Sequence, residues 1–331
     1  MAARANCLTD VPGLSLGHAT DARLATGVSV VRPHAPAAAS VDVRGGGPAT
    51  RETDLLRPEA TVDRIHALTL SGGSAYGLDA AGGVVDGLRA AGAGFEVAGQ
   101  LVPIVPGAAI FDLTVGAGSD WGDAPPYRAL AGRALDDAVD RPGGEGNVGA
   151  GLGATAGALK GGLGTASAIA RSGATVAALV VCNSFGQTVM PGTDTFWAFA
   201  LEEDGELGGQ VPAAPARPVA AHDVYRVEPG TSTTLAVIAT DAELDKARLA
   251  RVAAMAHAGL ARAIRPAHGP LDGDVVFALS TARRTLHDPL PELTEVGTLA
   301  ADCLARACAR GVYAAEPLHG WPSYKSRHAS P

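Results

Sequence analysis

The sequence predicts an α/β protein in which helices enclose central β-sheets within a single globular domain. Apolar strand-like runs alternate with amphipathic helical segments along the chain, which favours the α/β class. Several strands follow one another with no helix between them, so a simple doubly wound order is not indicated. The chain has 331 residues, 47% of them hydrophobic, which is enough for one large core.

The first part of the chain contains short strands and a strand–turn–helix unit. Strands are expected at Val28–Val31, Ala38–Val43 and Ile65–Leu70. Ser71–Ser74 then forms a glycine turn into a helix over Ala75–Ala91, whose apolar residues have helical spacing. This turn lacks the GxGxxG spacing, so the sequence does not predict a dinucleotide site.

The middle of the chain is rich in glycine and alanine. We expect a strand at Val102–Ile110 broken by two prolines, a short helix at Leu130–Ala138, and a closely packed helix of small residues at Gly149–Ala158. A buried strand follows at Ala174–Cys182. The polar, proline-rich segment Glu202–Asp223 is expected to form a mobile loop.

The last third alternates strand and helix. A strand of β-branched residues is expected at Thr233–Thr240, followed by a long amphipathic helix over Asp241–Ile264 with its first residue as the N-cap. A further strand at Val275–Ser280 leads to the last helix, Glu292–Arg310. Residues 318–331 are expected to form a peripheral tail.

Charge and composition exclude several classes of function. Twenty-six basic and 34 acidic residues give a net charge of −8, with no Lys/Arg cluster, so nucleic acid and anionic membrane surfaces are not expected partners. No stretch reaches the ~20 apolar residues of a membrane span, and Met1–Asp10 does not resemble a secretory signal. The four cysteines form no CxxC pair. We therefore expect a soluble cytoplasmic protein without a metal or cofactor.

Two short segments place polar side chains at the ends of predicted strands. Thr233 and Thr234 open a buried strand after the turn at Pro229-Gly230, where a hydroxyl nucleophile would have a rigid base. Asn183 ends another strand, where an amide can donate to a developing oxyanion. Threonine is also common in ordinary strands, and asparagine in ordinary turns, so each signal alone is weak.

Two further segments carry charge. Lys160 stands in a glycine-rich run that lacks the Walker order, so it is either an exposed turn lysine or a cation that lowers the pKa of a neighbouring nucleophile. Asp272 and Asp274 flank a glycine and lie on the same side if the backbone is extended. Two nearby carboxylates can raise one another's pKa or hold an ammonium group between them. A calcium loop would need more oxygen ligands than this segment supplies. The alternative is an ordinary Asp-Gly turn.

Together and in this order, these segments resemble a family. The chain is similar to the self-processing aminopeptidases of the DmpA and β-aminopeptidyl type, and particularly to the nylon-oligomer (6-aminohexanoate-oligomer) hydrolases. The resemblance spans nearly the whole chain. The matching segments are Leu8–Leu14, Ser71–Leu78, Val105–Leu113, Gly149–Lys160, Val180–Gly186, Thr233–Ala242 and Asp272–Ala278.

The resemblance implies a layered αββα sandwich and an N-terminal-nucleophile-type hydrolase. The precursor would cut itself between Ser232 and Thr233 into fragments 1–232 and 233–331, and the freed Thr233 would be the nucleophile. Its new α-amine could act as the base for its own hydroxyl, because an unperturbed α-amino group titrates at about 7.7–8.0.

The same resemblance implies roles for four other residues. Lys160 would help set the protonation of the nucleophile, and Asn183 would support the oxyanion. Asp272 and Asp274 would orient the threonine amine or a substrate amine, with their division of roles left open. The implied substrate is a small peptide or amide with a free amine, and the implied assembly is a homo-oligomer, a tetramer of cleaved heterodimers.

Two departures from the family pattern bear on activity. Ser232 replaces the asparagine that nylon-oligomer hydrolases carry before the scissile bond, although the attack needs the carbonyl and not that side chain. Phe111 stands where the family uses a tyrosine, so either self-cleavage or turnover is slower, or Tyr76 or a water replaces the phenol. Phe111, Tyr76 and Thr234 are expected to bind substrate or line the site.

Two alternatives remain open. Ornithine acetyltransferases share the fold and the self-released threonine, although their Ala-Thr-Met-Leu context differs from Ser232–Leu235. An uncleaved, non-catalytic relative is the other alternative.

Overall fold

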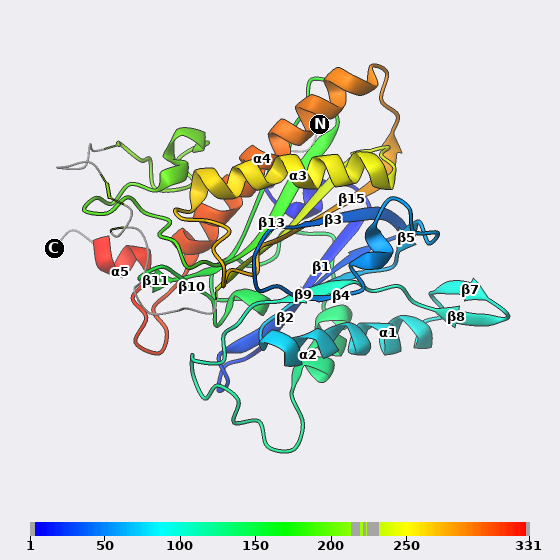
Figure 1. The fold of residues 1–331 in the computed structure, drawn as a ribbon, viewed down its shortest axis with the longest axis horizontal. Coiled ribbons are helices and arrows are strands. Elements are labelled where there is room, and N and C mark those ends of the chain that lie inside the picture. Colours follow the sequence, from blue (N-terminus) through cyan, green and yellow to red (C-terminus); the bar gives the residue numbers. More distant parts are fainter. Residues whose placement is uncertain (1–3, 213–218, 221–222, 224–231, 329–331) are drawn as a thin grey trace.

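Two β-sheets lie face to face between two pairs of helices in the computed structural model, which describes residues 4–212, 219–220, 223 and 232–328. In Figure 1, α3 and α4 lie above the sheets, and α1 and α2 lie below them. The expected layered αββα sandwich in a single domain is therefore confirmed.

The upper sheet has six strands, two of which contain Asn183 and Thr233. Its order is β12 (Gly162–Ile169), β13 (Thr175–Asn183), β14 (Thr233–Ala242), β15 (Val275–Arg284), β3 (Ala37–Val43) and β5 (Arg64–Ile65). Strands β14 and β15 run parallel, and the other neighbouring pairs run antiparallel.

The lower sheet has five strands, and two small hairpins lie outside both sheets. The five are β1 (Leu14–Asp21), β2 (Thr26–Pro33), β6 (Leu68–Ser71), β9 (Gly107–Ala109) and β4 (Ala49–Arg51). The hairpins are β7 (Phe95–Val97) with β8 (Gln100–Val102), and β10 (Thr155–Ala156) with β11 (Leu159–Lys160).

Helices α1 to α4 cover the outer faces of the sheets, and the short helix α5 packs against α4 at one end of the molecule. They are α1 (Ala80–Ala90), α2 (Tyr127–Asp136), α3 (Lys246–Ala263), α4 (Pro289–Ala314) and α5 (Tyr324–His328), with short 3₁₀ turns at Leu8–Asp10, Asp54–Leu56, Ser74–Asp79, Gly149–Gly151 and Trp197–Leu201. Within the described ranges, no helix has the length and apolar character needed to cross a membrane.

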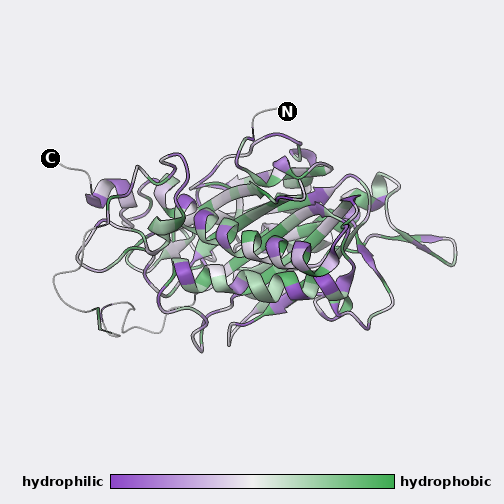
Figure 2. Ribbon diagram, turned by 90° about the horizontal axis from the view of Figure 1, so that it is seen from above, coloured by the Kyte–Doolittle hydropathy of each residue, from purple (hydrophilic) through white to green (hydrophobic). Residues whose placement is uncertain are grey.

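The central strands are apolar on both faces, because each face meets a different layer. Along β14, Leu235 and Val237 pack between the two sheets, whereas Ala236 and Ile238 pack under α3 and α4. Figure 2 shows the hydrophobic residues concentrated along the strands, with hydrophilic residues on the helices and outer loops. By this alternation, Thr233 lies on the face between the sheets and Thr234 on the helix face.

Three expected elements differ in the structure. Ile65–Leu70 is not one strand: β5 and β6 belong to different sheets. Gly149–Ala158 is not a helix but a 3₁₀ turn followed by β10, because Gly149 and Gly157 have positive φ angles (+52° and +57°) that interrupt a helix. Val102–Ile110 is interrupted at its prolines, as expected, but its two parts belong to different sheets, β8 to a small hairpin and β9 to the five-stranded sheet.

The expected N-cap of the long helix is also wrong. Asp241 belongs to β14, and its Oδ1 accepts a hydrogen bond from the Thr175 N–H (2.7 Å). The helix begins later, where Asp245 caps it by accepting from the Arg248 N–H (2.8 Å).

Two segments expected to lie outside the core are described in part. Residues 213–218 and 221–222 of the expected loop Glu202–Asp223 lie outside the described residues. In the expected tail, Tyr324 is buried and its ring stacks on Phe196 at 4.5 Å between centroids, so this part of the tail packs against the body of the protein.

Candidate active site

One end of the six-stranded sheet gathers the predicted site residues. Asn183 is the last residue of β13 and Thr233 the first of β14, and the two are direct register partners. Asp272 and Asp274 immediately precede β15, whose start lies beside the start of β14 because these strands are parallel. Lys160 ends β11, two residues before β12 begins at the same end of the sheet.

The backbone around Thr233 is held by the Asp272–Asp274 segment. The carbonyl oxygen of Ser232 accepts a hydrogen bond from the Gly273 N–H (2.8 Å), and the Thr234 N–H donates to Asp274 Oδ1 (2.8 Å). Thr233 is 5% exposed, and its Oγ1 would lie 2.5 Å from a Cβ at Gly273. The Thr233 hydroxyl therefore lies directly against Gly273.

The two aspartates have different surroundings. Both oxygens of Asp274 are occupied, since Oδ1 accepts from Thr234 and Oδ2 accepts from the His268 N–H (3.0 Å) and Nδ1 (2.7 Å). Asp272 Oδ2 accepts from the Gly269 N–H (2.6 Å), and burial together with the nearby Asp274 charge raises the pKa of Asp272 to about 6. Asp274 thus anchors the start of β14, whereas Asp272 is held by the turn at Gly269 and has a raised pKa.

The side-chain amide of Asn183 is held in a defined orientation. Its Oδ1 accepts from the Thr155 N–H (2.9 Å), and its Nδ2 donates to the Phe111 carbonyl (3.1 Å). Nδ2 carries two N–H groups, and the described residues supply a partner for one of them. The amide can therefore donate its second N–H to a new oxyanion beside Thr233.

Lys160 is fully buried, with its ammonium group inside a cage of backbone carbonyls. Nζ donates to Gly151 (3.1 Å), Ala154 (2.8 Å) and Gly161 (3.0 Å). Burial lowers the pKa of Lys160 to about 7, with the charge of Asp112 opposing the shift. Within the described ranges, none of these Nζ hydrogen bonds reaches Thr233, so any influence on the nucleophile acts through space or through a water.

Asp112 is a buried carboxyl group that the sequence reasoning missed. Its Oδ2 accepts from the Thr26 hydroxyl (2.6 Å) and its Oδ1 from the Gly73 N–H (2.8 Å), while burial raises its pKa to about 6. Its position directly after Phe111, within the segment Val105–Leu113 that resembles the family, could have identified it.

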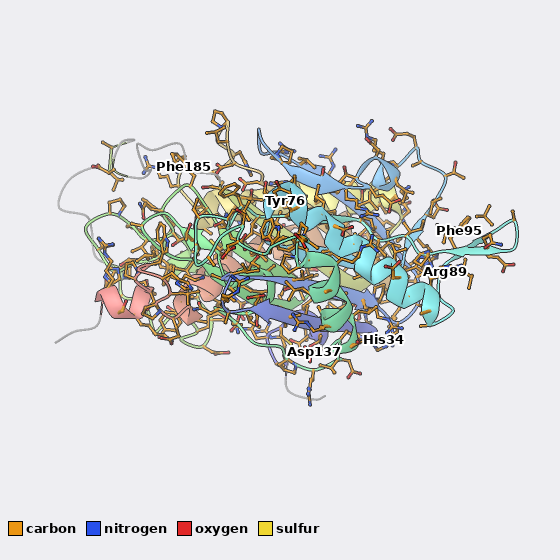
Figure 3. The ribbon with its side chains drawn as sticks, turned by 90° about the horizontal axis from the view of Figure 1, so that it is seen from below. His34, Tyr76, Arg89, Phe95, Asp137 and Phe185 are labelled. Atoms are coloured by element: carbon orange, nitrogen blue, oxygen red, sulfur yellow. The ribbon has the colours of Figure 1, made fainter. Side chains whose placement is uncertain are left out.

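The two expected aromatic residues contribute less directly. Phe111 is linked to the site through its backbone carbonyl, which binds Asn183. Tyr76 is 54% exposed and packs edge-on against Trp121 at 5.2 Å between ring centroids (Figure 3). This ring contact joins Tyr76 to Trp121 and not to Thr233, so the structure provides no support for Tyr76 as the replacement phenol.

Thr234 contributes its backbone and not its hydroxyl. Its N–H binds Asp274, whereas its buried Oγ1 has no hydrogen-bond partner among the described residues. The sequence reasoning also missed His268, which stands six residues before Asp274 and binds it through both backbone and ring. The His268 ring lies 4.9 Å from that of His257, between centroids.

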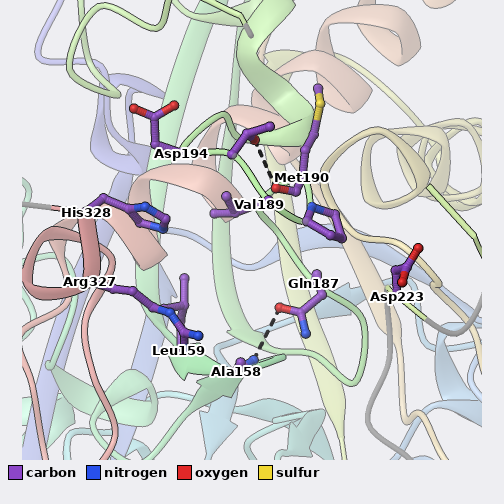
Figure 4. A pocket seen from close by; sticks show the side chains of 12 residues that line it. Ala158, Leu159, Gln187, Val189, Met190, Asp194, Asp223, Arg327 and His328 are labelled. Carbon is purple, nitrogen blue, oxygen red and sulfur yellow. Dashed lines mark hydrogen bonds between the residues drawn. The ribbon is translucent and has the colours of Figure 1, made fainter. Parts of the chain in front are cut away.

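A cleft of about 570 Å³ lies behind the hairpin that carries Lys160 (Figure 4). Ala158 and Leu159 line one side, with the Ala158 N–H donating to Gln187 Oε1 (3.3 Å), and Arg327 and His328 line another. None of the five predicted catalytic residues lines this cleft. It borders the site through the β10–β11 hairpin and does not contain the nucleophile.

Solved structures contain the same layered fold. A β-aminopeptidase of Burkholderia sp. superposes with a TM-score of 0.73 at 22% identity, covering 99% of this chain and 92% of that one. The L-aminopeptidase D-Ala-esterase/amidase of Ochrobactrum anthropi, described as a variant of the Ntn hydrolase fold, gives a TM-score of 0.71 at 24% identity, covering 96% and 88%. The fold is therefore that of the Ntn-hydrolase aminopeptidases.

Sequence comparison identifies the family. The model of peptidase family S58 matches residues 6–325, so the chain belongs to this family. Its members hydrolyse peptide or amide bonds, and the predicted hydrolase class is confirmed.

Two relatives show the range of similarity. An uncharacterized aminopeptidase of Mycobacterium tuberculosis is 46% identical over 97% of both chains. The 6-aminohexanoate-oligomer endohydrolase of Paenarthrobacter ureafaciens is 29% identical over 93% of this chain and 82% of its own.

Proposed function

We propose that this protein is a self-processing amide hydrolase in which Thr233, released by cleavage after Ser232, is the nucleophile. The observation that carries the proposal is the position of Thr233. It begins a buried central strand, pairs in register with Asn183, and lies against the segment that holds Asp272 and Asp274. A nucleophile, an amide donor and a titratable carboxyl group thus meet at one sheet end.

Self-cleavage proceeds as an N-to-O acyl shift followed by hydrolysis. The Thr233 Oγ attacks the Ser232 carbonyl carbon, the bond to the Thr233 nitrogen breaks, and the hydroxyl proton passes to that nitrogen. The product is an ester between Ser232 and Thr233 Oγ with a free Thr233 amine. Water then hydrolyses the ester, giving the Ser232 carboxylate and restoring the hydroxyl.

The same groups support turnover of a substrate amide. The free α-amine accepts the Thr233 hydroxyl proton as Oγ attacks, and the Asn183 amide donates to the oxyanion that forms. Lys160, whose pKa burial lowers to about 7, would adjust the charge near Thr233. The leaving amine takes up the proton, and water releases the acyl group.

The proposed substrate is a small peptide or linear amide with a free amine. The acidic pair Asp272 and Asp274 favours a cationic group near Thr233, and the relatives include aminopeptidases and 6-aminohexanoate-oligomer endohydrolases by name. The proposal includes assembly of the cleaved heterodimers into homo-oligomers in the cytoplasm, as the resemblance implies.

The test compares adjacent threonines. Thr233→Val should leave a single uncleaved chain on a denaturing gel and no hydrolysis of aminoacyl or 6-aminohexanoyl anilides. Thr234→Val, which removes a hydroxyl without a hydrogen-bond partner among the described residues, should cleave and hydrolyse like the native protein. N-acetylated anilides should be poor substrates. Cleavage by Thr233→Val at the native rate would contradict the proposal.

A further inference from the structure

The scissile peptide is bound on both sides by one short backbone segment. On one side of Thr233, the Ser232 carbonyl accepts from the Gly273 N–H (2.8 Å); on the other, the Thr234 N–H donates to Asp274 Oδ1 (2.8 Å). Ser232 also forms a parallel bridge with Asp272. These contacts fix the carbonyl that the hydroxyl must attack, relative to the strand that carries the hydroxyl.

We propose that Gly273 is a catalytic residue of self-cleavage: its N–H is the donor that stabilises the oxyanion formed at Ser232, and its missing side chain leaves the space that Thr233 Oγ1 occupies. This inference rests on the proposed function. As Oγ1 attacks, the carbonyl π electrons move onto the Ser232 oxygen, the atom to which the Gly273 N–H already donates. The charge therefore develops at a hydrogen bond that exists before the reaction.

The close contacts around Gly273 support the proposal that its missing side chain leaves space for Thr233 Oγ1. A Cβ at this position would lie 2.5 Å from Thr233 Oγ1 and 3.1 Å from both Thr233 Cγ2 and the Gly47 carbonyl oxygen. Threonine is branched at Cβ and has few side-chain rotamers, so an alanine here displaces the hydroxyl from its position. Gly273 does not adopt a positive φ, so the conformation itself does not demand glycine.

A purely structural alternative accounts for the same hydrogen bond. The β14–β15 pairing begins at Leu235 and Val275, and the Ser232–Asp272 bridge continues it in the same register. The hydrogen bond from Gly273 to Ser232 belongs to this bridge, and such bonds occur in any parallel sheet. The two explanations differ in what they predict for a variant that keeps the fold and loses the donor. A structural bond leaves the rate of cleavage unchanged, whereas a catalytic donor does not.

The decisive experiment exchanges the Gly273 N–H for an ester oxygen. Full-length chain is made by cell-free synthesis with glycolic acid at position 273, and the fraction cleaved is followed over time by intact mass. Loss of one preorganised donor should slow cleavage about 10²–10³-fold. Cleavage within twofold of the native rate, in a variant with a native circular dichroism spectrum, would overturn the donor role.

Alanine variants test the spatial role. Gly273→Ala should accumulate the uncleaved chain, and the double variant with Thr233→Ser should recover part of the rate, because serine is not branched at Cβ and can turn its hydroxyl clear of the new methyl group. Gly47→Ala is the matched control: it packs on the same segment, but its Cβ would lie 3.7 Å from the nearest atom, the Leu271 carbonyl oxygen. Equal rates for Gly273→Ala and Gly47→Ala would overturn this role.

Measurements on the native chain distinguish failure of the proposed function from failure of the Gly273 role alone. A native chain that stays whole removes the proposed function and this inference with it. A native chain that cleaves, together with an ester variant that cleaves equally fast, removes only the role of the Gly273 N–H.

Discussion

Two of the three lysines in the chain are held in the same way in different parts of the fold. Lys160 Nζ donates to three backbone carbonyls beside the site. Lys246 begins α3, and its Nζ donates to the carbonyls of Leu55 (2.9 Å), Ala60 (3.0 Å) and Val62 (3.1 Å). Burial lowers the pKa of both lysines. A carbonyl cage is therefore not in itself a sign of catalysis.

The two lysines differ in the exposure of the acidic residues near their carbonyl cages. The acidic neighbours of Lys246 are Asp63 and Glu59, both exposed, so water screens their charge. The acidic neighbour of Lys160 is Asp112, which is buried, and Lys160 itself is fully buried at the sheet end that carries Thr233. Lys246 ties a loop to a helix, whereas Lys160 places a buried charge at the sheet end that carries Thr233, the proposed nucleophile.

The largest expected effect comes from removing each lysine in turn. Lys160→Met should reduce both self-cleavage and kcat/KM by about tenfold or more, because it removes the charge that adjusts the protonation of Thr233, and a change of about 1.4 kcal/mol in such an interaction alters a rate tenfold. Lys246→Met should leave kcat/KM within about twofold and lower the unfolding free energy by about 1–3 kcal/mol, because buried carbonyls lose their donor. Equal losses of activity in the two variants would show that the comparison is wrong.

The pH dependence of stability gives a second contrast. The folded pKa of Lys160, about 7, lies below the ordinary lysine value of 10.5, so between these pH values the unfolded chain binds more protons than the folded one. Stability relative to Lys160→Met should therefore rise with pH across this window, with a slope of up to about 1.4 kcal/mol per pH unit. Urea unfolding from about pH 6.5 to about pH 10 measures it, with and without Lys160→Met in the uncleaved Thr233→Val background, so that both proteins are single chains; a flat difference would contradict the burial of this charge.

A smaller effect should follow from removing the acidic neighbours. The Asp112 charge raises the pKa of Lys160, so Asp112→Asn should move the Lys160-dependent limb of the pH–rate profile to lower pH. Asp63→Asn, beside Lys246, is the matched control and should leave the profile in place. A shift in the control, or movement of the Asp112→Asn limb to higher pH, would count against the assigned pairing.

The sequence predicted the parts of the fold that rest on local pattern. The runs around Ala177 and Val276 are continuously apolar and form central strands, as expected for strands buried on both faces. The helix expected at Gly149–Ala158 is wrong because small residues fit a helix and a close-packed turn equally well. The N-cap expected at Asp241 is wrong because local pattern does not show that β14 continues through this residue.

The site residues also divide into those that sequence motifs indicate and those that only the tertiary fold brings together. Ordered motifs indicated Thr233, Lys160, Asn183, Asp272 and Asp274, and the structure brings them to one sheet end. Contacts that depend on tertiary placement could not be predicted in this way. Asp112 gains its buried partners from residues 39 and 86 positions away, and Gly273 meets Ser232 only because β14 and β15 run parallel.

Intact mass of the purified full-length protein tests the central claim most directly. Self-cleavage predicts two species, residues 1–232 and 233–331, whose masses sum to that of the precursor plus one water. The Thr233→Val variant prepared in parallel should give one species of 331 residues. A native protein that retains the single mass of the whole chain after prolonged incubation, or that splits at another bond, would contradict the account.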